Sequence, residues 1–173
     1  MWTSANLNDL INEARKPQIL GRRWGRIGRA NSVDFSELER TPNTGELKFF
    51  TDNPMVGGMV VEDSVVINPF KQWKPEERNS ILTNESIRLF MRRNNIKPKF
   101  NVTEEQTNFF RNNRTNTGSN YIDNPSELRE TIIARIIAGD PSSGTPTKDQ
   151  IDIAENIINL LKEKGISGIR GVK

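Results

Sequence analysis

The chain has 173 residues, which suits a single domain, and its formal net charge at pH 7 is only +3. Only 34% of the residues are hydrophobic, so we expect a modest core with part of the chain lying outside it. The chain has neither Cys nor His, which excludes disulfides, zinc sites with thiolate or imidazole ligands, and nucleophilic systems that need either residue. Sites that need only Asp and Glu stay open.

A short amphipathic helix is predicted over residues 4–15, where apolar residues recur at helical spacing until Pro17 ends the pattern. The next stretch, residues 15–29, holds six basic residues and no acid, the strongest charge asymmetry of the chain. Its glycines disfavour a rigid helix, so we predict a flexible basic arm. Two interpretations stay open: the arm binds phosphates, or it contacts another protein. The candidate contact residues are Arg22, Arg23, Trp24, Arg26 and Arg29.

A small β unit is predicted after the arm. Residues 46–51, 55–61 and 64–67 have the composition of short strands, and Glu62-Asp63 suits a tight turn between the last two. We expect these strands to form an antiparallel meander. A meander of this size is barely stable alone, so it must pack on helices or pair with another chain.

The second half of the chain is predicted to be helical. A central helix begins at Pro75 and ends near Arg93, and apolar residues nearly surround its second half, as is typical of a helix buried on two sides. Three more helices are predicted from start signals at Thr103, Pro125 and Thr147. The last two have a short connection and suit an antiparallel αα-hairpin.

Three other segments are predicted to lack regular structure. Pro98 keeps residues 97–99 extended, and the polar residues 111–120 suit a surface loop. The C-terminal tail, residues 165–173, has no capping signal, so we expect it to be ordered only against a partner.

The predicted fold class is α+β, mainly α: a helical core of three to four helices with a small antiparallel β meander and extended N- and C-terminal arms. We divide the chain into an N-terminal helix with the basic arm, the meander, the helical core and the tail, at residues 1–45, 46–70, 71–164 and 165–173.

Two segments carry a resemblance to a known group of proteins. They read VVINPFKQWKPEERNSILTNESIRLFMRRNNIKP and SELRETIIARIIAGDPSSGTPT. An Asn-Pro-Phe before a PEER helix, followed by an R-I-x-x-G-D-P-S-x-G-x-P segment, resembles small proteins encoded by tailed bacteriophages. The similarity covers roughly residues 55–150 and includes no assigned active site. It implies a virion or virion-assembly setting, for a protein made in the host cytoplasm.

Our principal hypothesis is a non-enzymatic structural or assembly subunit of a tailed-phage virion, such as a neck, decoration or internal component, which acts through protein–protein contacts made by its arms. Its expected partners are other virion proteins, in a homo-oligomer or a hetero-assembly. The alternative is a nucleic-acid-binding accessory protein that uses the basic arm on DNA. An enzyme using carboxylates is the third hypothesis, but the acids singled out by sequence are scattered at helix starts and turns: Glu62, Asp63, Glu76, Glu77, Glu104 and Glu105.

No cofactor, metal or membrane contact is expected. The N-terminus lacks a basic segment followed by an apolar run, so we predict no secretory signal. No apolar stretch approaches the roughly 20 residues that a membrane span needs.

Overall fold

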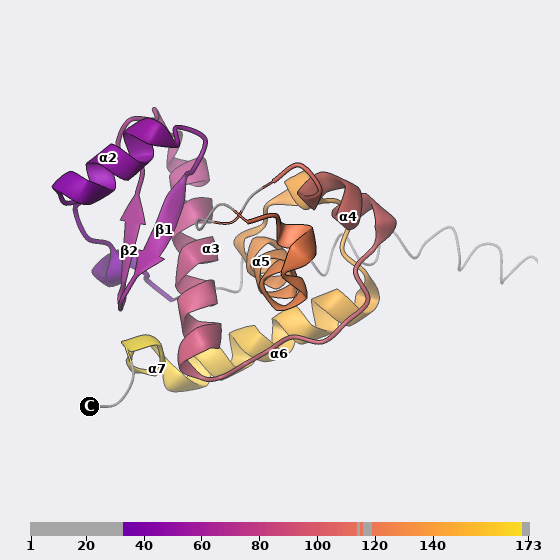
Figure 1. Ribbon diagram of the computed structural model, residues 1–173. Coiled ribbons are helices and arrows are strands. Elements are labelled where there is room, and N and C mark those ends of the chain that lie inside the picture. Colours follow the sequence, from indigo (N-terminus) through magenta and orange to yellow (C-terminus); the bar gives the residue numbers. More distant parts are fainter. Residues whose placement is uncertain (1–32, 114, 116–118, 171–173) are drawn as a thin grey trace, which may run out of the picture.

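The computed structural model describes residues 33–113, 115 and 119–170 of the chain (Figure 1). This part is mainly helical with a two-stranded antiparallel sheet, which confirms the predicted α+β class. Its elements, with η for a 3-10 helix, are η1 (Ser36–Leu38), α2 (Thr44–Asp52), β1 (Gly58–Val61), β2 (Ser64–Ile67), α3 (Pro75–Arg93), α4 (Glu104–Phe110), η2 (Tyr121–Asp123), α5 (Pro125–Ala138), η3 (Pro141–Ser143), α6 (Lys148–Lys164) and α7 (Ser167–Arg170).

Helix α3 organises the fold. It lies between the β hairpin on one side and α5 on the other, and α7 packs against it as well (Figure 1). Every residue from 85 to 91 is buried, a run of nearly two turns that includes all sides of the helix, and Ile87, Phe90 and Met91 are 0% exposed. The prediction of a central helix buried on two sides is therefore confirmed.

The hairpin of β1 and β2 is a thin layer between α2 and α3. Met59 pairs with Val66 in the antiparallel ladder, and successive side chains alternate between the two faces. Val65 and Ile67 join the main core, whereas Met59 and Val66 join Phe50 of α2 in a second, smaller cluster. Two strands are marginal on their own, and burial on both faces supplies the missing stability.

Residues 46–51, predicted as a strand, instead form most of helix α2. Asn43 and Glu46 make a capping box, in which each side chain accepts a 2.9 Å hydrogen bond from the other residue's backbone N–H. Arg40 donates two hydrogen bonds of 2.8 Å to the same Glu46 carboxylate. This N-terminal cap and the burial of Phe50 override the strand preference of the adjacent phenylalanines.

The predicted meander is therefore a hairpin of two strands. Strand β1 begins at Gly58 rather than at Met55, whereas β2 has the predicted bounds. Glu62 adopts a φ of 54°, in the left-handed region, where it closes the tight turn predicted at Glu62-Asp63.

The predicted capping boxes of α4 and α6 are confirmed, and a buried glutamine pair joins them. Gln106 and Gln150 occupy the third helical positions of the two boxes that Thr103 and Thr147 open. Their side-chain amides exchange hydrogen bonds of 2.7 and 2.9 Å, and Gln150 Nε2 also donates to the Asn101 carbonyl at 3.2 Å. Two helix starts far apart in the sequence are thus fixed to each other.

The C-terminal tail differs from its prediction as far as residue 170. Residues 167–170 form α7, and the Ile169 side chain is 0% exposed in the main core. Asn94, just after α3, donates a hydrogen bond of 2.8 Å to the Gly168 carbonyl. The apolar residues of this segment therefore find their partner within the chain itself.

Candidate functional site

The five residues predicted to make partner contacts lie in residues 1–32, outside the described part of the chain: Arg22, Arg23, Trp24, Arg26 and Arg29. The predicted helix at residues 4–15 lies there as well. The role of the basic arm stays a prediction, and the candidate surfaces below come from other residues.

The first surface is apolar and lies at the open end of the hairpin. Met55, just before β1, and Phe70, just after β2, are 83% and 58% exposed. These are the exposed large hydrophobic side chains among the described residues. Because Gly58 pairs with Ile67 in the ladder, the segments that carry Met55 and Phe70 leave the sheet side by side. We call Met55 and Phe70 the apolar pair.

Asn68 fixes the backbone around the apolar pair. It is 0% exposed, and its backbone and side-chain polar groups form hydrogen bonds within the chain. Its backbone N–H donates to the Gly57 carbonyl and its side-chain amide to the Val56 carbonyl, both at 2.9 Å. Its side-chain oxygen accepts from the Phe70 N–H at 2.9 Å, and its carbonyl accepts from the Trp73 indole at 3.0 Å. The segments before β1 and after β2 are therefore one rigid unit.

Side chains pack closely beneath this unit at Gly57, where an added Cβ atom would require the Ile81 side chain to shift. A Cβ atom there would come within 2.9 Å of the Ile81 side chain and 3.4 Å of the Trp73 ring. The Lys71 ammonium lies 4.8 Å from the centre of the same Trp73 ring, a cation–π contact. The two exposed hydrophobic side chains thus stand on a well-packed base.

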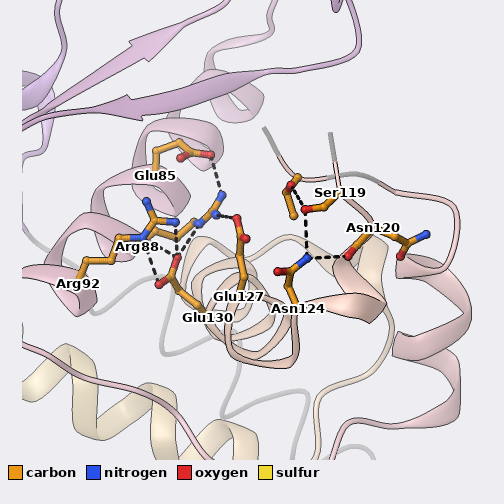
Figure 2. Close-up of polar contacts among 9 residues, drawn as sticks. Glu85, Arg88, Arg92, Ser119, Asn120, Asn124, Glu127 and Glu130 are labelled. Carbon is orange, nitrogen blue, oxygen red and sulfur yellow. Dashed lines mark hydrogen bonds and ion pairs between the residues drawn. The ribbon is translucent and has the colours of Figure 1, made fainter. Parts of the chain in front are cut away.

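The second surface is charged and is formed by ion pairs between α3 and α5. Figure 2 shows Arg88 of α3 reaching Glu127 and Glu130 of α5, with Glu85 one turn earlier on α3. Arg88 donates to the Glu130 carboxylate at 3.1 Å and to the Glu127 carboxylate at 3.2 Å, and lies 3.6 Å from the Glu85 carboxylate. Arg92 also donates to Glu130, with its closest contact at 2.8 Å.

The central charges of this network are buried, so each depends on its ion-pair partners. Arg88 is 4% exposed and Glu85 6%, and Glu85 Oε2 has no hydrogen-bond partner among the described residues. Burial raises the pKa of Glu85, and nearby Arg88 offsets only part of that effect. Burial alone would lower the pKa of Arg88, but Glu85 and Glu130 more than compensate and raise it, so Arg88 stays charged. Charges this deep are tolerated only when they are paired.

A pocket of about 620 Å³ opens beside the network, between the edge of β1 and the first turn of α5; its lining includes Val60, Arg92, Asn124, Glu127 and Glu130. Asn124 fixes one wall by donating to the Asn120 carbonyl at 3.0 Å and the Ser119 hydroxyl at 3.1 Å (Figure 2). The Glu130 carboxylate accepts hydrogen bonds from two guanidinium groups, those of Arg88 and Arg92.

The acids singled out by sequence are not gathered at this pocket. Asp63 pairs with Arg93, while Glu76 and Glu104 lie in the first turns of α3 and α4, where the helix dipole favours acids. Sequence reasoning missed Glu85, Glu127 and Glu130. The available signal was the i, i+3 spacing of Glu85 with Arg88 and of Glu127 with Glu130, but only tertiary packing shows that the two faces meet.

No protein-family model, curated protein or solved structure matches this chain. Within the described residues, no group of three or more Asp and Glu side chains is placed to hold a metal ion. None of the helices described combines the length and apolarity needed to cross a membrane.

Proposed function

We propose that this protein is a non-enzymatic structural or assembly subunit of a tailed-bacteriophage virion and acts through protein–protein contacts. The observation that carries the proposal is the apolar pair, Met55 and Phe70, held out to solvent on the rigid unit centred on Asn68. The virion setting rests on the resemblance described above, which includes the Asn-Pro-Phe sequence at residues 68–70.

Rigidity distinguishes this surface from ordinary exposed hydrophobic residues. Single exposed apolar side chains are common on proteins and need no explanation. Here the backbone on both sides of the hairpin is fixed by a buried Asn whose hydrogen bonds are all made within the chain. Because this backbone is already fixed, the conformational entropy lost when a partner covers Met55 and Phe70 is mainly that of the two side chains.

The expected energetic gain is sufficient for an interface anchor. Fully burying a Phe or Met side chain contributes about 1.5–3 kcal/mol. Because Met55 is 83% and Phe70 58% exposed, the two together contribute about 2–4 kcal/mol when a neighbouring subunit covers them, which is the scale of an interface hot spot. Because this contact is apolar, it should persist at high ionic strength.

The test is the molar mass of the purified full chain by size-exclusion chromatography with light scattering, at low salt and at about 0.5 M salt. We expect a defined oligomer whose mass is the same in both buffers. The double variant Met55→Ser/Phe70→Ser should shift the mass toward the monomer while its thermal unfolding midpoint stays close to that of the wild type, since both side chains are exposed.

A matched variant, Met55→Leu/Phe70→Leu, keeps apolar side chains at both positions and should remain oligomeric. A wild-type chain that is monomeric at every concentration, or an oligomer that the Ser variant leaves intact, would overturn the role assigned to the apolar pair.

A further inference from the structure

A third surface has a net positive charge among the described residues. It is a pocket of about 500 Å³ beside the extended segment that follows α3, and its lining includes Lys97, Lys99, Phe100, Arg129 and Asp149. Three of these side chains are basic and one is acidic. Lys97 and Lys99 are exposed and have no ion-pair partner among the described residues.

Arg129 differs from the other arginines of α3 and α5. Arg78, Arg88, Arg92, Arg93 and Arg135 each form an ion pair with a carboxylate. Arg129 instead donates to two backbone carbonyls, those of Phe100 at 2.9 Å and Pro125 at 3.2 Å. No carboxylate within the described part of the chain pairs with it, so its orientation is fixed while its charge is left available.

The two lysines are placed to act together with Arg129. Both lysines line the same pocket as Arg129, with Pro98 between them. The Arg129 guanidinium also lies 5.9 Å from the centre of the Phe100 ring, which packs it against the segment that carries the lysines. The Arg129 guanidinium is therefore held by hydrogen bonds, and the Lys97 and Lys99 side chains on the same pocket are exposed.

We infer that this surface, Lys97, Lys99 and Arg129, binds the phosphodiester backbone of duplex DNA. Lys offers a mobile point charge and Arg a fixed fork of donors, and both groups complement phosphate oxygens. The surface offers no recognition helix, so we expect binding without sequence preference. This inference goes beyond the proposed assembly role and uses different residues from the apolar pair.

The experiment measures binding of the full chain to a fluorescently labelled DNA duplex of mixed sequence over a range of salt concentrations. Each phosphate contact contributes about 0.9 to the slope of log K against log salt. The variant Lys97→Gln/Lys99→Gln should therefore have a slope shallower by about 1.8. Between about 50 and 200 mM salt, the wild type should lose roughly 12-fold more affinity than this variant. Arg129→Gln should lower the slope by about 0.9 more.

A control double variant distinguishes the contribution of this surface from the effect of net charge alone. Lys48→Gln/Lys162→Gln removes the same charge from exposed positions on α2 and α6, and it should leave the slope unchanged. A Lys97→Gln/Lys99→Gln slope equal to the wild type, or a control pair that lowers the slope as much, would overturn the inference. Displacement of the duplex by poly-glutamate at equal charge concentration would also overturn the inference, because it would indicate an acidic protein as the partner.

The two proposals can fail separately. Met55→Ser/Phe70→Ser should leave the salt slope for DNA unchanged, and Lys97→Gln/Lys99→Gln should leave the oligomeric mass unchanged. The basic arm is present in every variant, so its contribution cancels in each comparison.

Discussion

Replacing the buried Arg88 by Met should destabilise the protein more than any single change to its surface charges. Arg88 is 4% exposed and pairs with Glu85, Glu127 and Glu130. Its removal leaves Glu85 without a cation within ion-pairing distance among the described residues and leaves Glu130 with Arg92 alone. Removing one partner of a buried ion pair costs about 3–5 kcal/mol, because a charge stays buried without compensation.

This loss corresponds to a large fall in the thermal midpoint. In a domain of this size 1 kcal/mol changes the midpoint by about 2–4 °C, so Arg88→Met should lower it by roughly 6–20 °C. The measurement is urea unfolding followed by circular dichroism at neutral pH, with the thermal midpoint as a second readout. Unfolding should become less cooperative only if α5 separates from α3 before the rest of the core.

Arg93→Met is the matched control on the same helix. Arg93 pairs with Asp63, but both side chains are 39% exposed, so we expect a loss within about 1 kcal/mol. Adding Glu85→Gln and Glu130→Gln to Arg88→Met should recover part of the loss, since fewer charges then remain buried. A loss below about 1 kcal/mol for Arg88→Met would refute the reasoning and show that water screens the network.

Two further predictions concern other buried polar groups. Because burial raises the pKa of Glu85, the folded chain holds this proton more tightly than the unfolded chain, and stability falls as pH rises from the unfolded value of about 4.3 through the folded one. Glu85→Gln should therefore gain stability relative to the wild type as pH rises to neutrality, measured by urea unfolding across that range; a difference independent of pH would contradict this. Gln150→Ala should cost about 1–3 kcal/mol, because it leaves the buried Gln106 amide without its partner, whereas Asn159→Ala, on an exposed site of the same helix, should cost less than about 0.5 kcal/mol. Equal losses for these two variants in urea unfolding would show that the glutamine pair contributes no specific stability.

Local chemistry made much of the helical framework predictable. Pro75 begins α3, and the capping boxes at Thr103 and Thr147 begin α4 and α6, because each signal acts within one turn of the chain. Gly139, with a φ of 75°, ends α5 for the same kind of reason.

The surfaces were much less predictable than the helices. The exposure of Met55 and Phe70 depends on which neighbours cover them, and no pattern in the sequence records that. Within the described residues, Arg129 has no carboxylate partner because its neighbours in space are the carbonyls of Phe100 and Pro125. Both facts arise from contacts between segments distant in sequence.

The sequence by itself determined where most helices start and stop, because capping and Pro or Gly geometry are local. The capping box of Asn43 and Glu46 is a local signal for α2, but only the tertiary structure decided that Phe50 is buried, that residues 167–170 pack on α3, and that Arg88 meets the acids of α5. The physical reason is burial. Residues far along the chain remove Phe50 and Ile169 from water, and this burial of apolar side chains is favourable. Arg88 is buried at a cost, which its ion pairs with Glu127 and Glu130 offset.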